Sequence, residues 1–300
     1  MSSNQTLITG ATGYLGRFVT RDLAGRGEDL VILKRRSSSL LGFGDLADHL
    51  RFVDIEEADL GALFEQNQFD TIIHCATNYG RDLIDPLSVI DANLLLPLKL
   101  LELARQHGVR RFVNTDTILD PRVNRYALTK SQFKEWLRRY SGDLACVNIA
   151  FEHFYGPGDN PTKFVTFVVR SLLAGVPELP LTPGEQWRHF VYIEDAATAI
   201  QKILEATQAE HSGMYAFEVG AEHPTRLRDM VELAKRLTCA PSTALRFGAL
   251  PYRPNEVMMP SIDDSLKQAT GWCPATPLEE GLRMTIEAER KTHKRKVHEL

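Results

Sequence analysis

Short apolar runs alternate with longer segments in which apolar residues recur every three or four positions along the first half of the chain. The short runs predict buried strands, and the longer segments predict amphipathic helices. The expected strands are residues 6–9, 29–33, 51–53, 69–75, 111–114 and 144–150. The expected helices are residues 14–26, 86–107 and 126–140, and Pro97 should distort the second because proline lacks a backbone N–H. This alternation is typical of parallel strands joined by crossover helices, so we expect an α/β fold.

The second half of the chain is less regular. Prolines and glycines become frequent at residues 156–161 and 179–184, and helical periodicity returns at 193–205, 225–236 and 277–290. We therefore expect two domains. The expected organisation is a sheet domain over residues 1–151, which segments around 185–210 and 214–222 rejoin or border, a smaller α/β cap over 152–290, and a flexible basic tail over 291–300.

Composition limits the classes of protein that fit this pattern. The 300 residues are 43% hydrophobic and 25% charged with a net charge of −4, which excludes a disordered chain and predicts no nucleic-acid or membrane partner. Four scattered cysteines without metal-ligand spacing predict free thiols in a reducing compartment and no metal site. Because the first residues lack the pattern of a secretory signal and no apolar run is long enough to span a membrane, we expect a cytoplasmic location.

Three glycines spaced three residues apart follow the first expected strand and open the first expected helix. Gly10 permits a tight turn, Gly13 lets a pyrophosphate approach backbone N–H groups at the positive helix end, and Gly16 allows the helix to pack on the sheet. This is a variant of the dinucleotide-binding fingerprint. It predicts a Rossmann-type doubly wound parallel sheet with a cofactor-binding turn. The residues expected to line that turn are Gly10, Thr12, Gly13, Tyr14 and Leu15.

The end of the second strand bears on which nicotinamide cofactor is bound. A site that prefers NAD places an acidic residue there for the ribose 2′-hydroxyl, but the sequence continues with Lys34, Arg35 and Arg36. Guanidinium groups at this position pair with a 2′-phosphate, so NADPH is the expected cofactor, although solvated basic residues at a strand end are the simpler alternative. Asp54 and Ile55, after the third strand, are placed to reach the adenine, unless Asp54 is an ordinary surface aspartate.

Tyr126 and Lys130 lie four residues apart and therefore share one face of the expected helix. A cation beside a phenol stabilises the phenolate, so we expect Lys130 to lower the pKa of Tyr126 toward the range of a general acid or base. Together with the glycine turn, this pair resembles the short-chain dehydrogenase/reductase superfamily. The closest resemblance is to its extended branch, the NAD-dependent epimerase/dehydratase family, whose members act on nucleotide sugars.

Further segments are similar to motifs of that branch and extend the resemblance over nearly the whole chain. They are residues 91–94 (DANL), 155–158 (YGPG), 188–195 (RHFVYIED), 252–256 (YRPNE), 271–274 (GWCP) and 278–282 (LEEGL). The resemblance implies that Cys75, Ala76, Asn93 and His153 border the cofactor. It also implies a homodimer in which the helices over 86–107 and 126–140 pack against their mates, although their apolar positions fit an intrachain core equally well.

Two departures from the branch narrow the resemblance further. The run 150–155 (AFEHFY) lacks the usual arginine and asparagine, and the segment between the fifth strand and Tyr126 is short. Both features look more like CDP-paratose and CDP-abequose synthases, which are NADPH-dependent 4-reductases of CDP-4-keto-3,6-dideoxyhexoses. On this resemblance the substrate residues are Tyr79, Arg81, Glu152, Lys163, Arg188 and Arg253. The hydroxyl that helps Tyr126 is assigned to Thr117, with Thr115 as the alternative.

The implied reaction is reduction of a sugar 4-keto group, with Tyr126 as proton donor, Thr117 as hydrogen-bond donor and Lys130 as the neighbouring cation. A nucleotide-sugar 4-epimerase with tightly bound NAD is the alternative enzyme. A dehydratase is less consistent, because Thr115 is followed by Asp116 and Thr117 rather than by an Asp-Glu pair. A non-catalytic NADPH-binding regulator is the alternative from another class, although such proteins typically lose the tyrosine that is present here.

Overall fold

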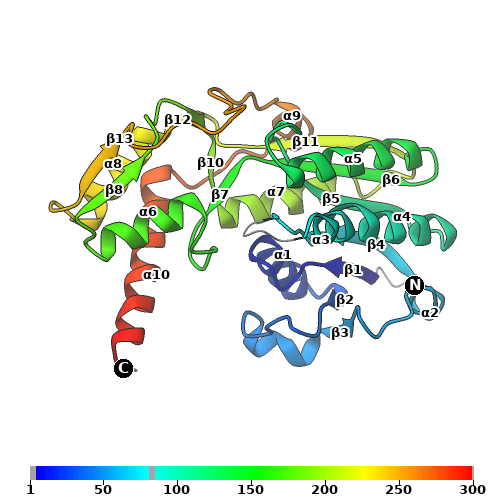
Figure 1. The fold of residues 1–300 in the computed structure, drawn as a ribbon. Coiled ribbons are helices and arrows are strands. Elements are labelled where there is room, and N and C mark those ends of the chain that lie inside the picture. The colour runs from blue at the N-terminus through cyan, green and yellow to red at the C-terminus, as the bar shows by residue number, and fades with distance from the viewer. Residues whose placement is uncertain (1–4, 81–84, 299–300) are drawn as a thin grey trace. The chain divides into compact units, whose positions relative to one another are not determined.

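The computed structural model describes residues 5–80 and 85–298. The chain divides into two compact units. The sheet unit comprises Met1–Phe151, Ala197–Glu218 and Asp263–Trp272, and the second unit comprises Glu152–Ala196, Val219–Ile262 and Cys273–Leu300. The path of the chain through both units is drawn in Figure 1.

Within the described residues, the sheet unit is built on one seven-stranded sheet in the order β11-β6-β5-β4-β1-β2-β3. Its strands are β1 (Gln5–Thr9), β2 (Asp29–Lys34), β3 (Arg51–Asp54), β4 (Phe69–His74), β5 (Arg111–Thr117), β6 (Ala145–Phe151) and β11 (Gly213–Val219). The pairs from β3 through to β6 are all parallel. This confirms the Rossmann-type α/β fold. Because the strand order reverses at β1, the carboxyl ends of β1 and β4 form the switch point where such sheets bind ligands.

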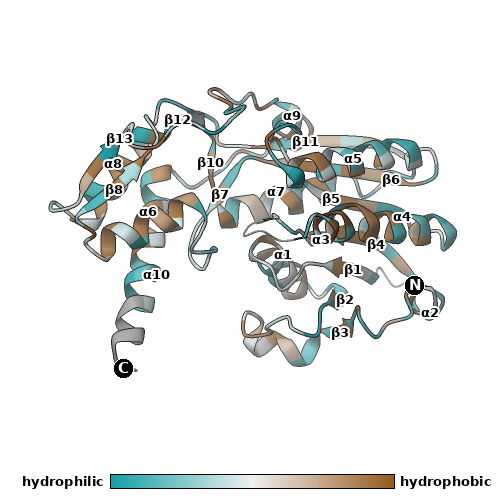
Figure 2. Cartoon of the chain, viewed as in Figure 1, coloured by the Kyte–Doolittle hydropathy of each residue, from teal (hydrophilic) through white to brown (hydrophobic). Residues whose placement is uncertain are grey.

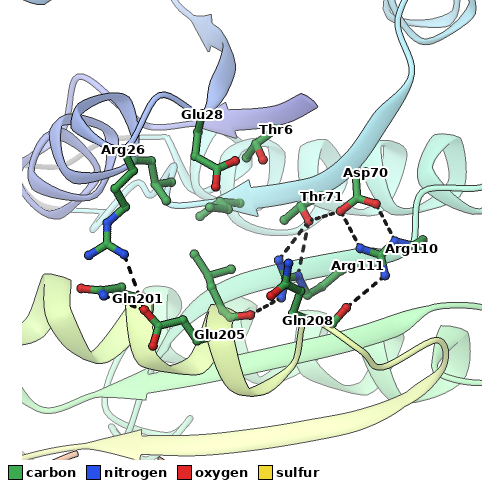
Figure 3. A pocket seen from close by; sticks show the side chains of 13 residues that line it. Thr6, Arg26, Glu28, Asp70, Thr71, Arg110, Arg111, Gln201, Glu205 and Gln208 are labelled. Atoms are coloured by element: carbon green, nitrogen blue, oxygen red, sulfur yellow. Dashed lines mark hydrogen bonds and ion pairs between the residues drawn. The ribbon is translucent and has the colours of Figure 1, made fainter. Parts of the chain in front are cut away.

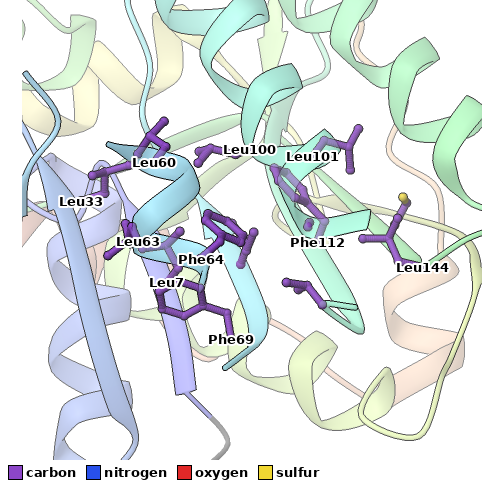
Figure 4. Packing of buried hydrophobic residues seen from close by; sticks show 14 of the residues in the cluster. Leu7, Leu33, Leu60, Leu63, Phe64, Phe69, Leu100, Leu101, Phe112 and Leu144 are labelled. Carbon is purple, nitrogen blue, oxygen red and sulfur yellow. The ribbon is translucent and has the colours of Figure 1, made fainter. Parts of the chain in front are cut away.

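Helices cover both faces of this sheet. They are α1 (Tyr14–Gly25), η1 (Gly44–His49), α2 (Leu60–Glu65), α3 (Pro86–Ile90), η2 (Asp91–Leu95), α4 (Leu96–Gln106), α5 (Arg125–Tyr140), α7 (Ile193–Ala206) and α9 (Ser265–Thr270). Side chains of α2, α4 and α5 form one hydrophobic core with Leu7, Ile72 and Phe112 of the strands (Figure 4). In Figure 2 the strands are largely hydrophobic, whereas outer turns of α5 are hydrophilic. This pattern is what burial of alternate strand residues under amphipathic helices requires.

The expected helix over 86–107 is interrupted, as Pro97 predicts. The five residues of η2 form a π-helix between α3 and α4. Proline lacks an N–H, and its ring would clash with the carbonyl oxygen four residues earlier, here that of Asn93. The wider turn, in which the Leu96 N–H bonds the Asp91 carbonyl, removes that conflict. The distortion also leaves Asn93 completely buried.

The second unit contains short strands and three helices in its described residues. The strands pair as β7 (His153–Tyr155) with β10 (Phe190–Tyr192), β8 (Glu178–Leu181) with β13 (Ala244–Phe247), and β9 (Trp187–Arg188) with β12 (Thr225–Arg226). The helices are α6 (Phe164–Leu173), α8 (Leu227–Thr238) and α10 (Leu278–His298). Helix α6 contacts both α8 and α10.

The last helix extends into the segment 291–300, beyond its expected end. Helix α10 continues through this segment to His298 instead of ending near residue 290. The segment contains neither glycine nor proline, and lysine and arginine are good helix formers. Lys291 and Glu287 lie one helical turn apart, and the ion pair between Lys291 Nζ and Glu287 Oε1 at 2.8 Å stabilises the helix there.

Two expectations from composition can be compared with the described residues. Cys75, Cys146, Cys239 and Cys273 are free thiols there. No helix among residues 5–80 and 85–298 is long and apolar enough to cross a membrane.

Candidate functional site

The turn between β1 and α1 requires glycine at two positions. Gly10 has a positive φ of 69°, and a Cβ there would lie 2.3 Å from the backbone nitrogen of Ala76. A Cβ on Gly16 would lie 2.2 Å from the carbonyl oxygen of Gly10. The chain therefore packs backbone against backbone at this turn. Gly13 is the N-cap of α1 and offers no capping side chain, so the amino end of a twelve-residue helix is left for a ligand.

This turn fits the pyrophosphate of a dinucleotide, because a side chain at Gly10 or Gly16 would fill the space that the turn needs. Thr12, Tyr14 and Leu15 lie at the same helix end, as predicted. Cys75 and Ala76 follow the adjacent strand β4, and the Cys75 N–H bonds the Thr9 carbonyl at 3.0 Å. Burial raises the pKa of the Cys75 thiol to about 12, so this side chain stays protonated and is not a nucleophile.

The end of β2 is less basic than its sequence suggests. Arg35 is exposed and has no ion-pair partner within the described residues. Arg36, in contrast, forms an ion pair with Glu57, and its backbone N–H bonds Glu56 Oε2 at 3.0 Å. No acidic residue follows β2 directly in the sequence, but two glutamates from a neighbouring turn contact Arg36. The two glutamates come from the turn after β3, which is the parallel neighbour of β2.

Asp54 lies at the end of β3 and forms an ion pair with Lys34 at the end of β2. The backbone N–H of Ile55 bonds the Lys34 carbonyl at 2.8 Å. Both residues thus lie at the same carboxyl edge of the sheet as the glycine turn. Asp54 is not a free surface aspartate, because its carboxylate is held by the neighbouring strand.

Helix α5 presents Tyr126 and Lys130 beside the end of β5. The helix begins at Arg125 because the Asn124 side chain accepts the Ala127 N–H at 2.8 Å. Lys130 is buried, and its Nζ donates to the carbonyl oxygen of Thr115 at 2.8 Å. The Tyr126 side chain hydrogen-bonds Thr117.

The two threonines of β5 differ in what their hydroxyls contact. Thr115 is buried, and its Oγ1 donates to the His74 carbonyl at 3.1 Å. Thr117 is half-buried and bonds Tyr126. Of the two predicted alternatives, Thr117 is therefore the hydroxyl that contacts the tyrosine.

The expected lowering of the Tyr126 pKa by Lys130 is wrong for this structure. Burial raises the pKa of Tyr126 well above its ordinary value, and the nearby Tyr79 and Asp116 raise it further, while the Thr117 hydrogen bond opposes them. The phenol is therefore neutral at neutral pH and carries a proton that it can donate. Burial also lowers the pKa of Lys130 to about 8, although Asp116 and Cys75 oppose that shift.

Asp116 was not singled out from the sequence. It is 6% exposed, and its carboxylate accepts the Thr117 N–H at 2.7 Å and Asn148 Nδ2 at 2.9 Å. Asn148 in turn accepts from Asn114 Nδ2 at 2.7 Å, which makes a buried polar chain across β5 and β6. The sequence does show a run of polar residues at the end of a buried strand. Which of these side chains contact one another becomes clear only when the pairing of the strands is known.

Asn93 holds the loop after β4 in place. Its Oδ1 accepts the Asn78 N–H, its Nδ2 donates to the Asn78 carbonyl, both at 2.8 Å, and Nδ2 also lies 3.1 Å from Thr129 Oγ1. The side-chain amide of Asn93 is therefore hydrogen-bonded to other groups of the protein. Tyr79 follows directly, and its ring centroid lies 5.0 Å from that of Tyr126. Arg81, predicted to face the sugar, lies outside the described residues.

The second unit holds the other predicted residues, and most of their charges are paired. Arg188 is 5% exposed and bonds Glu256, while its Nε lies 3.7 Å from Glu152 Oε1. Glu152 accepts the backbone N–H groups of His153 at 3.1 Å and His189 at 2.7 Å. Burial raises the pKa of Glu152, but these hydrogen bonds and the nearby cations outweigh burial and lower it overall.

Lys163 and Arg253 complete that set. Lys163 Nζ lies 3.5 Å from Asp159 and 4.2 Å above the centre of the Phe154 ring. Arg253 is 69% exposed and lies 3.3 Å from Glu256. Within the second unit Arg253 is therefore the most accessible of the predicted cations. Among the described residues, the predicted residues of the sheet unit other than Asn93 lie at or just after the carboxyl ends of β1 to β5, at the amino end of α1 or on α5, so one sheet edge brings them together.

A separate cavity of about 110 Å³ lies at the opposite, amino edge of the sheet unit, between α1, α7 and the strands (Figure 3). Buried Arg111 lies in its lining and bonds Thr71, Thr207 and the Leu204 carbonyl. None of the predicted site residues lines this cavity. It is therefore not the dinucleotide site.

Comparisons with known proteins identify the family of this chain. The model of the NAD dependent epimerase/dehydratase family matches residues 6–220. A CDP-abequose synthase of Salmonella typhimurium is 29% identical and covers 92% of this chain and 95% of its own. A UDP-glucose 4-epimerase of Mycolicibacterium smegmatis is 28% identical and covers 94% of this chain and 97% of its own.

Solved structures are similar at the level of the fold. The UDP-glucose 4-epimerase of Thermotoga maritima with UDP-glucose aligns with a TM-score of 0.83 at 22% identity, covering 96% of this chain and 99% of its own. The predicted family resemblance is thus confirmed by a match over most of the chain. With its glycine turn and its Tyr126–Lys130 pair, this chain is an enzyme that belongs to the NAD-dependent epimerase/dehydratase family.

Proposed function

We propose that this enzyme uses NADPH to reduce the 4-keto group of a CDP-linked deoxyhexose in deoxysugar biosynthesis. The observation that carries the proposal is the position of Tyr126, hydrogen-bonded to Thr117 and followed one turn later by buried Lys130. A phenol whose pKa is raised retains its proton at neutral pH, which suits a step that delivers a proton to a developing alkoxide. The similarity to CDP-abequose synthases supports the substrate class.

In this proposal the chain's own residues position the substrate and move the proton. The Gly10–Gly16 turn and the amino end of α1 hold the pyrophosphate, and the bound cofactor supplies the hydride. Thr117 hydrogen-bonds the keto oxygen, and Tyr126 Oη donates its proton to that oxygen as charge develops. The Lys130 ammonium, 2.8 Å from the Thr115 carbonyl, provides a nearby positive charge without touching the substrate.

The test is turnover of a Tyr126→Phe variant. We expect a loss of about 100- to 10,000-fold in the rate of NADPH consumption with a CDP-4-keto-deoxyhexose, and unchanged NADPH binding by fluorescence titration. Thr117→Val should lose about 100-fold, and Thr115→Val is the matched control with a small effect. A Tyr126→Phe enzyme that keeps most of its rate would contradict the assigned role.

The cofactor preference is a separate part of the proposal. Arg35 supports NADPH, because a guanidinium pairs with a 2′-phosphate. An Arg35→Ala, Arg36→Ala double variant should lose about 10- to 100-fold in kcat/KM for NADPH and little for NADH. Equal losses in kcat/KM for both cofactors would show that the two arginines do not bind the 2′-phosphate.

A 4-epimerase that retains NAD is the second candidate function. Glu56 and Glu57, in the turn after β3 and in contact with Arg36 beyond the end of β2, favour it, since carboxylates there can accept hydrogen bonds from a ribose. The similarity to a UDP-glucose 4-epimerase also favours it. Purified enzyme that carries bound NAD and consumes no added NADPH would select this function. Net NADPH consumption would exclude it.

We also propose a homodimer formed through the helices α4 and α5. Leu95, Leu128 and Trp136 are 51%, 45% and 41% exposed on η2 and α5, although large apolar side chains are normally buried.

Three predicted substrate residues of the second unit, Lys163, Arg188 and Arg253, remain predictions from the family resemblance, as do Glu152 and His153.

A further inference from the structure

Asp116 of β5 carries a buried carboxylate without an adjacent cation. It is 6% exposed, and in the described part of the chain it forms no ion pair. Its oxygens accept the Thr117 N–H at 2.7 Å and Asn148 Nδ2 at 2.9 Å. Because removing a carboxylate from water is costly, buried carboxylates normally have a charged partner. We therefore looked for the positive charge that this carboxylate stabilises.

The Lys130 ammonium has the complementary arrangement. It is 1% exposed, and its Nζ donates to the Thr115 carbonyl at 2.8 Å, but it too forms no ion pair with a residue that the structure describes. Thr115 and Asp116 are consecutive, so the end of β5 holds both charges. Opposite charges interact more strongly in a buried site, where the effective dielectric constant is low. Asp116 accordingly raises the pKa of Lys130 and opposes the effect of burial.

The other titratable groups around Lys130 carry no negative charge near neutral pH. Burial raises the pKa of the Cys75 thiol to about 12. Burial and the nearby ammonium lower the pKa of His74 well below its usual value, which keeps that imidazole neutral. The rings of Tyr126 and Tyr79 lie 5.0 Å apart, and phenols are uncharged at neutral pH. The carboxylate on β5 is thus the negative charge that opposes burial of the ammonium.

The same carboxylate fixes the threonine that contacts the proton donor. The Thr117 hydroxyl bonds Tyr126, and the Thr117 N–H is held by Oδ1 of Asp116. The second oxygen, Oδ2, is held by Asn148 of β6, whose own Oδ1 accepts Asn114 Nδ2 at 2.7 Å. Asn114 and Asn148 are register partners on the two strands. Because hydrogen bonds hold both of its oxygens, the carboxylate keeps one orientation and fixes the end of β5.

We propose that Asp116 is a positioning residue that acts as the counter-charge of the Lys130 ammonium and holds the Thr117 hydroxyl against Tyr126. This inference rests on the proposed reductase function and assigns a further residue to the same site. Negative charge develops on Tyr126 as it gives up its proton, and a nearby ammonium stabilises that charge. By keeping the ammonium charged, Asp116 supports proton delivery without touching the substrate.

Two substitutions separate the charge from the hydrogen bond. Asp116→Asn removes the charge but keeps an oxygen that can accept the Thr117 N–H, whereas Asp116→Ala removes both. Relative to wild type at the same pH, kcat of Asp116→Asn for a CDP-4-keto-deoxyhexose should be similar near pH 6 and about tenfold lower near pH 9. Asp116→Ala should lose about tenfold more at every pH. KM for the sugar should change by less than about threefold in both.

A titration of Lys130 tests the counter-charge without turnover. Its 13Cε signal in NMR, assigned by its absence from Lys130→Met, reports the protonation of the ammonium. The midpoint should lie near pH 8 in wild type and about one pH unit lower in both Asp116 variants, so either variant that still binds NADPH is sufficient. Asp143→Asn makes the same change in the exposed turn before β6 and should leave the midpoint unchanged.

The outcomes distinguish the two proposals. An unchanged Lys130 midpoint in the Asp116 variants overturns the counter-charge, whatever reaction the enzyme catalyses. A lowered midpoint in an enzyme that reduces none of the ketones supports the counter-charge and contradicts the reductase function. If Asp116→Ala loses no more activity than Asp116→Asn, the carboxylate does not hold Thr117 in place. If the loss in Asp116→Asn is the same at every pH, the charge of Asp116 does not act through Lys130.

Discussion

At the scale of single residues, the most unusual group is the buried ammonium of Lys130. It is 1% exposed, and its one hydrogen-bond acceptor among the described residues is the Thr115 carbonyl. Burial lowers its pKa from the ordinary 10.5 to about 8. At about 1.4 kcal/mol per pH unit, this corresponds to a destabilisation of roughly 3 kcal/mol. The enzyme thus holds a charge at its proposed active site at the expense of stability.

Replacing Lys130 by Met should therefore stabilise the fold and abolish activity. The apolar side chain removes the cost of burying the charge. Loss of the hydrogen bond to the Thr115 carbonyl offsets about 1–2 kcal/mol of that gain. We expect a net gain of about 1–2 kcal/mol in the free energy of unfolding at pH 7, measured by urea denaturation.

The pH dependence of the stability tests whether burial of the Lys130 charge is the cause of this difference. The folded pKa lies below the unfolded value, so between pH 8 and 10.5 the unfolded state binds more protons and the stability of wild type rises with pH. The advantage of Lys130→Met should thus be greatest below pH 8 and shrink toward pH 10. A constant difference over that range would mean that burial of the charge is not its source.

At the scale of elements, the turn between β1 and α1 depends on close backbone packing. An alanine at position 10 would need a positive φ of 69° and would place its Cβ 2.3 Å from Ala76. Backbone atoms of β4 cannot move aside as a flexible side chain would. Gly10→Ala should therefore lower the free energy of unfolding by at least about 2 kcal/mol and weaken dinucleotide binding.

Gly25, at the end of the helix that follows this turn, is the matched control. It ends α1, and a Cβ there would meet nothing within 4 Å. Gly25→Ala should leave cofactor binding unchanged and raise stability by about 0.5–1 kcal/mol, because alanine is the better helix former. Thermal denaturation and cofactor titration of both variants check the pair. Equal effects of the two substitutions would contradict the packing argument.

At the scale of the whole molecule, the exposed apolar side chains on η2 and α5 predict self-association. Trp136 lies on α5, 41% exposed, and a charge at this position would oppose its burial between subunits. Trp136→Glu should convert a dimer of wild type into a monomer in sedimentation velocity. Phe167→Glu, at a similarly exposed position of α6, is the control and should leave the dimer intact. A monomeric wild type would exclude this interface.

Several features followed from the sequence alone. The parallel strands, the glycine turn and the shared helical face of Tyr126 and Lys130 depend on short-range periodicity and on sterics within a few residues. The distortion at Pro97 is of the same kind, because it follows from a missing N–H. Local chemistry also indicated the family, which the match over residues 6–220 then confirmed.

The tertiary structure decided which side chains meet across strands. Glu56 and Glu57 reach Arg36 only because β2 and β3 are neighbours, and spacing along a single strand cannot show this. The direction of the shift in the Tyr126 pKa likewise depended on burial and on the charge of Asp116. Spacing along the sequence does not show how close Asp116 lies to Tyr126. Burial and cross-strand contact are properties of the packed chain. For this reason the sequence indicated candidate groups for the chemistry, and only the fold set their protonation and their partners.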